Sequence, residues 1–443
     1  MIITNTLTGK KEVFTPLQKQ QVTLYVCGVT PYDYAHLGHG RVYVTFDVLY
    51  RLLQFLDYHV TYCRNFTDVD DKIIARAQKD LGDAHRFKEI SEKYIFAFHE
   101  DFAQLNCLAP TYEPRVTQTI PEIINFIQAL IDAGKAYTSN GDVYFEIAQF
   151  PQYGQLSKHK LDDLIAGARV EINEKKKNPL DFALWKHADS GQPGWDSPWG
   201  LGRPGWHIEC SAMAQKFLGK TIDIHAGGMD LIFPHHENEI AQSQGLTGVC
   251  FACYWMHNGF VRINQEKMSK SLGNFFTLRD IFKEFDPMVV RFYLLNHHYR
   301  APLDFSFDDL RMAQKAYIRL CRAFDQECAI VSSQEMKKSS YVQNMLLFLE
   351  DDLNTPGMWG TVFESLPELQ KDTQELCRVK AFISQVLGLT LIPLAQKEVE
   401  ITSQMEGLIQ QREQARIQKD WKKADELREK LKGLGYQVQD KKF

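Results

Sequence analysis

A strand, a glycine-bearing turn and a long helix follow one another directly at residues 21–56, and this order is the strongest constraint on the fold. Apolar side chains alternate along residues 21–29, which predicts a strand. After a turn that contains Gly38 and Gly40, the apolar positions of residues 42–56 recur at helical spacing. Such a unit opens a nucleotide-binding α/β fold, in which the N-terminus of the helix attracts anionic groups.

Further strands extend this architecture, and an irregular stretch interrupts it. Residues 59–64, 221–225 and 254–258 have the composition of strands in one sheet, whereas residues 137–196 are rich in turns and resemble an insertion. Helical patterns dominate after residue 271. A chain of 443 residues is also too long for a single core. The expected fold class is α/β: a Rossmann-like parallel-sheet domain with an insertion, followed by a helical bundle.

The helical regions can be placed more closely. Residues 72–134 are mainly helical in pattern, and residues 308–330 and 341–352 are amphipathic at helix spacing. Residues 398–434 predict two helices with a break near Lys419, and glycines end the second of them.

Composition narrows the class of protein. Hydrophobic residues make up 44% of the chain and charged residues 24%, as in globular proteins, and no apolar run reaches the length of a membrane span. Residues 1–11 are polar and lack a signal core, so a cytoplasmic protein without membrane association is expected. With no export signal, the nine cysteines are expected to be reduced thiols, buried or metal-bound. A net charge of −5 neither requires nor excludes nucleic acid.

A candidate metal site centres on the sequence His-His-Glu-Asn-Glu. Pro234 is suited to begin a helix, and His235 and Glu239 then lie on one face of it. Cys27 and Cys210 are candidates for the other half of the site. Two thiolates, an imidazole and a carboxylate suit Zn²⁺ better than Mg²⁺ or Ca²⁺, which prefer oxygen ligands. The alternative is a polar helix face with a capping or surface histidine.

Two short motifs suggest nucleotide chemistry. His-Leu-Gly-His at residues 36–39 places two imidazoles at the start of a helix, and Gly38 leaves room for a base or a phosphate. Lys-Met-Ser-Lys-Ser at residues 267–271 can close two ammonium groups over a polyphosphate and neutralise departing pyrophosphate. Each motif alone also fits an ordinary helix start or an exposed loop.

Together, the motifs resemble the two signatures of class I aminoacyl-tRNA synthetases, with Leu37 in place of isoleucine and the lysine motif unchanged. Residues 25–28, 65–72, 205–213 and 233–239 are similar to the cysteinyl-tRNA synthetase family, and the resemblance covers nearly the whole chain. It implies ATP-dependent ligation of L-cysteine to the 3′ end of tRNA(Cys) through a cysteinyl-adenylate. The partners implied are tRNA(Cys), L-cysteine and ATP with Mg²⁺, and we expect a monomer.

The resemblance also implies site residues. One Zn²⁺ per subunit would be bound by Cys27, Cys210, His235 and Glu239. The catalytic residues would be His36, His39, Lys267 and Lys270, and ATP would contact these together with Gly38 and Asp230. The cysteine pocket would be lined by Gly28, Thr67, Trp206, His225 and Asp230.

The same resemblance divides the chain into six parts. They are residues 1–120 and 201–260 as the two halves of the catalytic domain, 121–200 as a connective insertion, 261–310 as a linking region with the lysine motif, 311–395 as a helical bundle, and 396–443 as a small anticodon-binding region.

Zinc has a physical rationale in cysteine selection. A cavity cannot exclude serine, which is no larger than cysteine, whereas Zn²⁺ binds a thiolate strongly and a serine hydroxyl weakly. Catalytic zinc usually has three protein ligands, so a fourth requires either five-coordination or a ligand that loosens. We expect five-coordination, with Glu239 the weakest ligand.

Several residues allow two interpretations. Trp206 is either a lid over the substrate or a core residue, and Asp230 holds either the ribose or the amino group. His207, Glu209 and His236 are expected to support or pack against the ligands, and Cys250 and Cys253 to be structural. Asp68, Asp70 and Asp71 could bind Mg²⁺, but we expect them to cap helices. Trp421 is either a residue that stacks on an unpaired base or a core residue between two helices.

Two rival functions remain open on the sequence alone. One is a ligase that passes activated cysteine to an amino-sugar, as in mycothiol synthesis, but such enzymes lack the C-terminal RNA-binding part. The other is a non-catalytic RNA-binding relative, which the two intact nucleotide signatures disfavour.

Overall fold

The computed structural model describes residues 1–159, 175–263, 266–267, 275–394 and 403–433. The chain divides into two compact units, Met1–Ile392 and Pro393–Phe443. Within the described residues, no helix is both long and apolar enough to cross a bilayer.

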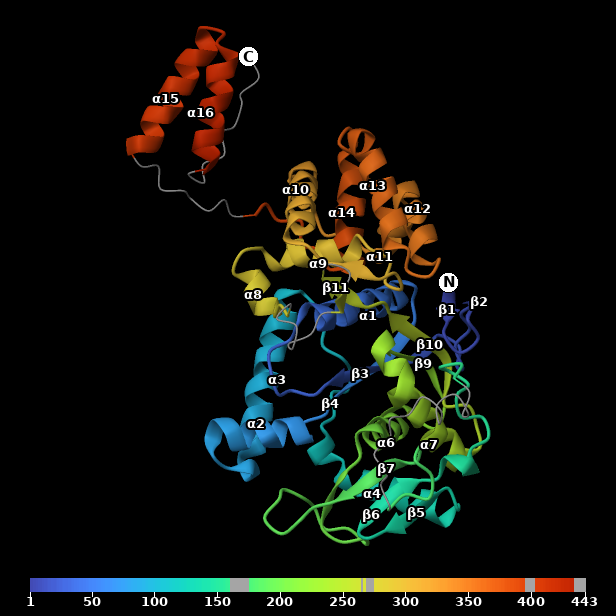
Figure 1. Cartoon of the computed structure of the whole chain (residues 1–443). Helices are drawn as coiled ribbons and strands as arrows, with labels where there is room; N and C mark the ends of the chain where they lie inside the picture. The colour runs from blue at the N-terminus through green and yellow to red at the C-terminus, as the bar shows by residue number, and fades with distance from the viewer. Residues whose placement is uncertain (160–174, 264–265, 268–274, 395–402, 434–443) are drawn as a thin grey trace. The chain divides into compact units, whose positions relative to one another are not determined.

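A four-stranded sheet lies at the centre of the first unit (Figure 1). Its order is β10–β9–β3–β4, and all neighbouring strands run parallel. The strands are β3 (Gln21–Val29), β4 (His59–Phe66), β9 (Ile222–Gly228) and β10 (Ala252–Asn258). These bounds confirm the predicted strands and the α/β class. Because the strands are parallel, their carboxyl ends meet at one edge of the sheet, where such folds bind ligands.

The helix α1 (Leu37–Phe55) follows β3 and is buried along most of its length. Its near-continuous apolar sequence reflects two buried faces, because α1 packs on the sheet and also contacts α9 (Pro287–Leu295) and α14 (Thr373–Leu387). The helix therefore connects the sheet with the helical part of the unit.

The chain between β4 and β9 forms a helical region and a second sheet. The predicted helices of residues 72–134 are confirmed as α2 (Asp71–Leu81), α3 (Phe87–Gln104) and α4 (Ile120–Asp132). An antiparallel sheet of order β5–β6–β7–β8 follows, comprising Ala136–Ser139, Asp142–Phe145, Phe182–His187 and Gly202–Pro204. The helix α6 (Trp206–Leu218) leads back to β9, and α7 (Glu237–Thr247) joins β9 to β10. The finer division of the chain into domains stays a prediction.

Short strands and helices complete the unit. An N-terminal hairpin, β1 (Ile2–Asn5) with β2 (Lys10–Val13), forms a bridge from Ile2 to Asp351, which lies in the loop after α12 (Ser340–Leu349). A small sheet has the order β12–β11–β13, formed by Glu266–Lys267, Val261–Ile263 and Leu303–Asp304. The other helices are α8 (Leu278–Phe282), α10 (Phe307–Ala323), α11 (Ser333–Lys337), α12 (Ser340–Leu349) and α13 (Thr355–Leu369).

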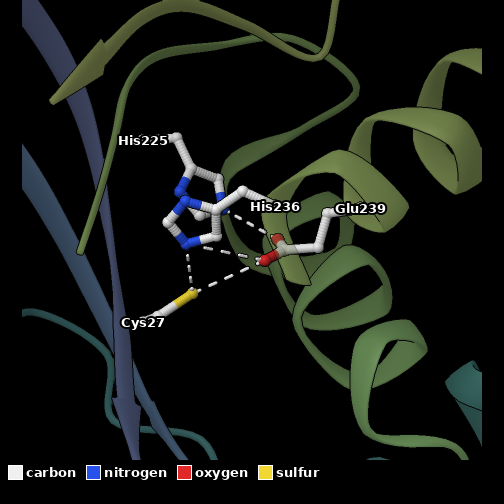
Figure 2. Close-up of side chains that lie close together, drawn as sticks. All are labelled: Cys27, His225, His236 and Glu239. Carbon is white, nitrogen blue, oxygen red and sulfur yellow. Dashed lines mark hydrogen bonds and ion pairs between the residues drawn. The ribbon is translucent and has the colours of Figure 1, made fainter. Parts of the chain in front are cut away.

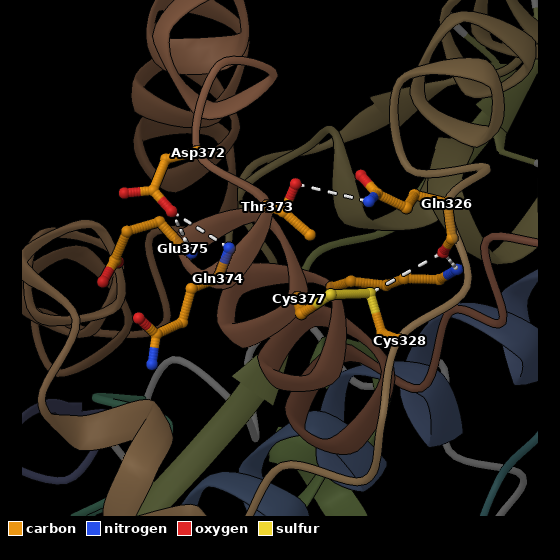
Figure 3. Close-up of a disulfide and its surroundings, with 8 residues drawn as sticks. Gln326, Cys328, Asp372, Thr373, Gln374, Glu375 and Cys377 are labelled. Atoms are coloured by element: carbon orange, nitrogen blue, oxygen red, sulfur yellow. Dashed lines mark hydrogen bonds between the residues drawn. A yellow bond between two sulfur atoms is a disulfide. The ribbon is translucent and has the colours of Figure 1, made fainter.

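The segment after α10 departs from two expectations. The helix predicted for residues 308–330 ends at Ala323, and Ile330 is fully exposed. A disulfide joins Cys328 to Cys377 of α14 (Figure 3), so the expectation of reduced thiols holds for seven cysteines and is wrong for this pair. The backbone carbonyl of Gln326 also accepts a hydrogen bond of 2.9 Å from the ammonium of Lys380. This connection is therefore attached to the side of α14.

The second unit contains the two helices predicted near the C-terminus, α15 (Ser403–Ile417) and α16 (Trp421–Gly433). Ala415, Ala424 and Leu427 are buried in this unit. Trp421 is 60% exposed, so the core interpretation of this residue is wrong.

Candidate functional site

Four side chains from three parts of the fold meet at the carboxyl edge of the central sheet. Cys27 comes from β3, Cys210 from α6, and His235 and Glu239 from the chain at the start of α7. All four are buried, and one potential ligand atom of each lies within 4.8 Å of those of the others. The two thiol sulfurs are 3.9 Å apart, and Cys27 Sγ is 3.5 Å from Glu239 Oε1. The metal hypothesis requires this convergence, and the ligand roles themselves stay predictions.

His235 and Glu239 keep the expected spacing of one helical turn. His235 Nε2 lies 3.0 Å from Glu239 Oε1. A π-type turn at residues 232–236 precedes the regular helix α7, which is assigned from Glu237. Within that turn Phe233 has an extended backbone, and the helical backbone begins at Pro234. The prediction that Pro234 starts the helical backbone is therefore confirmed.

A second group of donors overlaps the first (Figure 2). His225 and His236 lie within reach of the same Cys27 and Glu239. His236 Nε2 is 3.3 Å from Cys27 Sγ, and His225 Nε2 is 2.8 Å from Glu239 Oε2. Sequence reasoning did not identify either histidine as a metal donor. The signal was structural: β9 pairs beside β3 with His225 opposite Tyr25, two residues before Cys27.

The electrostatics of the site suit a metal with soft ligands. The hydrogen bond from the Cys27 thiol lowers the pKa of Cys210 to about 6, against the effect of burial. Burial opposes ionisation of Glu239 too, but His225 and His235 hold its pKa well below the usual range. A thiolate, a second thiol, an imidazole and a carboxylate enclosed together fit Zn²⁺.

Trp206 covers one side of the donor group. Its indole is 40% exposed and stacks on the His235 ring, with the centroids 4.3 Å apart. The core interpretation of Trp206 is therefore wrong. Also near the donors, Thr67 donates a hydrogen bond of 2.9 Å to the buried Glu209 carboxylate, whose pKa is raised well above its ordinary value by burial. His207 Nδ1 lies 2.9 Å from His235 Nδ1, so His207 contacts a candidate ligand, as expected.

Gly28 is required by a close approach of two strands. A Cβ atom at this position would lie 1.5 Å from the carbonyl oxygen of Asn65, so any side chain would separate β3 from β4. The Gly28 amide also donates to Asn65 Oδ1 at 2.9 Å. The backbone beside Cys27 is thereby fixed.

The start of α1 forms the second part of the site. His36 is the N-cap, its side chain accepts a hydrogen bond from the His39 amide, and the two rings stack at 3.6 Å. Both imidazoles therefore lie at the positive end of the helix. Asp230 is exposed after the end of β9. Lys270 and the side chain of Lys267 lie outside the described residues.

The remaining candidates form local contacts or lie outside the donor groups, and of the three aspartates Asp70 is the one that caps a helix. Asp70 caps α2 through the Lys72 amide, as expected, and Asp68 accepts hydrogen bonds from Thr117. Asp71 forms ion pairs with Lys186 and Arg203. Cys250 is exposed and Cys253 half-buried, and neither belongs to a donor group among the described residues.

Two sequence families match the chain. The family described as tRNA synthetases class I (C) catalytic domain matches residues 13–315. The family described as cysteinyl-tRNA ligase anticodon binding domain matches residues 398–442.

Related proteins align with nearly the full length of this chain. A cysteine–tRNA ligase of Trichlorobacter lovleyi is 46% identical, over 98% of this chain and 97% of the relative. A cysteine–tRNA ligase of Geobacillus thermodenitrificans is 47% identical, over 98% of this chain and 96% of the relative. Among solved structures, Mycobacterium tuberculosis methionyl-tRNA synthetase in complex with methionyl-adenylate matches with a TM-score of 0.59 at 12% identity, over 84% of this chain and 90% of that one. This last likeness establishes the fold.

Proposed function

Because this chain belongs to the cysteinyl-tRNA synthetase family of class I aminoacyl-tRNA synthetases, we propose that it ligates L-cysteine to the 3′ end of tRNA(Cys). In the first step the cysteine carboxylate attacks the α-phosphate of ATP, and pyrophosphate leaves. In the second step a terminal ribose hydroxyl of the tRNA attacks the acyl carbon of the cysteinyl-adenylate, and AMP leaves.

The convergence of Cys27, Cys210, His235 and Glu239 is the observation that carries this proposal. These four side chains would hold Zn²⁺, which supplies a soft Lewis acid with a strong preference for a thiolate over a hydroxyl. The chain itself contributes a donor group that is closed to bulk water, since all four residues are buried. His225 supports the site by fixing the second oxygen of Glu239.

The rest of the cysteine pocket follows from the surroundings of this group. Trp206 is the partly exposed aromatic beside His235 and acts as a cover over the bound amino acid. Gly28 and Thr67 line the pocket on the side of β3 and β4, and Asp230 presents an exposed carboxylate to the amino group or the ribose.

Positioning and charge neutralisation carry the first step. His36 and His39 at the N-terminus of α1 donate to phosphate oxygens as negative charge grows, and Gly38 lets the nucleotide approach the backbone. Lys267 and Lys270 neutralise the departing pyrophosphate, with Mg²⁺ bound to ATP. No protein nucleophile is required.

The second unit supplies the binding surface for the tRNA anticodon. Its match to an anticodon-binding family and the exposed Trp421 among basic residues support this role. The same match disfavours the amino-sugar ligase, which would lack this part. We propose a cytoplasmic monomer that takes up one zinc ion.

Cysteine-dependent exchange of pyrophosphate into ATP tests the first step, with serine as the matched control. We expect exchange with cysteine alone. Charging of a tRNA(Cys) transcript tests the second step, with a tRNA transcript of another specificity as the control. Absence of exchange would indicate the non-catalytic relative, and exchange without charging would indicate the amino-sugar ligase.

A further inference from the structure

Arg41 is a buried cation for which the described part of the chain supplies no acidic partner. It lies on α1 directly after the His-Leu-Gly-His motif and is 1% exposed. Among the described residues no carboxylate forms an ion pair with it, and burial lowers the pKa of its guanidinium to about 10. An isolated buried charge destabilises a fold unless hydrogen bonds compensate it, so its acceptors indicate what it does.

The hydrogen-bond acceptors that Arg41 finds among the described residues are backbone carbonyls, and they belong to two segments. Nη1 donates to the carbonyls of Gly259 at 3.3 Å and Phe260 at 3.1 Å. Nη2 donates to the carbonyls of His298 at 3.0 Å and Tyr299 at 3.3 Å, and also to that of Ala301. One planar guanidinium therefore holds together the segments that lead into β11 and β13, which pair in one sheet.

The two segments approach too closely for any side chain between them. A Cβ atom on Gly259 would lie 2.5 Å from the Ala301 carbonyl oxygen and 2.7 Å from that of Arg300. The Gly259 amide donates to the Tyr299 carbonyl at 2.8 Å. Gly259 thus allows the two segments to approach each other, and Arg41 independently bonds both of them.

The strand β11 places Lys267 in the fold. β11 lies beside α1 in Figure 1, and Arg262 of β11 pairs with Lys267 of β12 in the antiparallel register. Phe260, an acceptor of Arg41, lies two residues before Arg262. Arg41 is therefore connected to the backbone of Lys267 through a short series of contacts: its hydrogen bond to Phe260, the strand β11, and the pairing of Arg262 with Lys267.

The chain that follows the lysine motif returns to the same end of α1. Leu278 N donates to the Ala35 carbonyl at 2.8 Å, and Leu37 N donates to the Phe276 carbonyl at 3.3 Å. The Phe275 ring also lies edge-on to the His36 ring, with centroids 5.3 Å apart. The flanks of the lysine motif are thus attached to α1 on both sides. On the upstream side the attachments include the Arg41 guanidinium and a hydrogen bond of 2.8 Å from Asn258 Nδ2 to Thr45 Oγ1.

We propose that Arg41 is a positioning residue that sets the strands leading to Lys267 at a fixed place relative to His36 and His39. This inference rests on the proposed function, in which these groups act on one ATP molecule. An error of about 1 Å in such a placement lowers the rate of the chemical step about 100-fold. Arg41 should therefore affect adenylate formation and leave cysteine binding intact.

Arg41→Lys keeps the charge but cannot reach both segments with a planar fork. In cysteine-dependent pyrophosphate exchange, we expect kcat to fall about 10- to 100-fold and the KM for cysteine to stay within about twofold. Gly259→Ala keeps Arg41 and displaces the same contact, so it should give the same split between kcat and KM. Zinc content, measured by metal analysis, should be unchanged in both variants.

Arg51→Lys is the matched control. Arg51 is also a buried arginine of α1, but it bonds the carbonyls of Gln385 and Asn106 and pairs with Asp47, away from β11. It should lower the thermal unfolding midpoint as much as Arg41→Lys does, with kcat near the wild-type value.

These experiments distinguish failure of the positioning role of Arg41 from failure of the proposed function. A wild-type kcat in both Arg41→Lys and Gly259→Ala, or an equal loss of kcat in Arg51→Lys, overturns the positioning role. An increase in the KM for cysteine that accounts for the whole effect also overturns it. Wild-type protein without any cysteine-dependent exchange refutes the proposed function itself.

Discussion

His225 Nε2 lies 2.8 Å from Glu239 Oε2, with both side chains fully buried. The other carboxylate oxygen, Oε1, is directed to His235 and Cys27. His225 also stacks on Trp255 at a centroid distance of 4.4 Å, so the imidazole itself has a fixed orientation. One oxygen of Glu239 is thus restrained and the other remains available within the donor group.

We therefore expect His225→Asn to lower the zinc affinity of the protein about 10- to 100-fold, because an unrestrained carboxylate is a poorer ligand. Competition with a chromophoric chelator measures this affinity. His99→Asn changes an exposed histidine that pairs with Glu113 and serves as the control. Unchanged zinc affinity in His225→Asn would show that Glu239 is either held by other contacts or not a ligand.

Cys210→Ala should remove zinc and the discrimination against serine together, because the variant loses one of the two sulfur ligands. The measurements are metal content and pyrophosphate exchange with cysteine and with serine. Cys63→Ala removes a thiol that is equally buried but outside both donor groups, and it should retain both properties. A zinc-free Cys210→Ala enzyme with full selectivity would refute zinc-based selection.

Local patterns in the sequence were sufficient for the elements around the site. The apolar character of β3 and α1 was enough to locate both elements, although both are buried on more than one face. The position of His36 and His39 at the start of α1 could be predicted because the glycine-bearing turn marks where this helix begins.

Long-range geometry could not be read in this way. Nothing local to residues 222–228 indicates that β9 pairs with β3, yet this pairing brings His225 toward Cys27. Pro234 follows the extended Phe233 as the first helical residue, as the preference of proline for the first turn predicts, but no local pattern indicates the π-type turn that precedes α7. Cys328 and Cys377 are 49 residues apart, and only the packing of the bundle brings them together.

Lys270→Ala should slow adenylate formation far more than it weakens cysteine binding, because the ammonium is required only as charge gathers on pyrophosphate. Pre-steady-state measurement of adenylate, with cysteine binding followed separately, gives both quantities. Lys283→Ala, at the exposed lysine that directly follows α8 and pairs with Asp280, is the charge-matched control. Equal losses of rate and binding in Lys270→Ala would contradict the assigned role.

Loss of the disulfide should destabilise the bundle. The bond closes a loop between residues 49 positions apart, and such a cross-link contributes about 2–4 kcal/mol through the entropy of the unfolded chain. Urea unfolding of Cys328→Ser should show this loss relative to oxidised wild type, whereas Cys250→Ser, at an exposed free thiol, should not. Two free thiols at Cys328 and Cys377 in protein purified without reductant would exclude the bond in solution.

The contact between α3 and α8 should make stability depend on pH. Burial raises the pKa of Asp101 from 3.8 to about 6, although Arg279 Nε donates to its Oδ1 at 2.7 Å. Asp101 Oδ2 has no hydrogen-bond partner within the described residues. In the interval between these two pKa values the folded protein keeps a proton that the unfolded chain has lost. Raising the pH through this interval therefore removes stability.

Asp101→Asn eliminates this titration with little change of shape. The unfolding midpoint of the variant should rise relative to that of wild type, by a few degrees, as the pH increases from about 4 to about 6. Thermal unfolding at several pH values gives the comparison. Asp189→Asn changes a carboxylate that is 81% exposed and should follow wild type throughout. The opposite result is a midpoint of Asp101→Asn that falls relative to wild type as the pH increases. It would mean that the ion pair with Arg279 outweighs the burial of the carboxylate, so that folding lowers the pKa of Asp101.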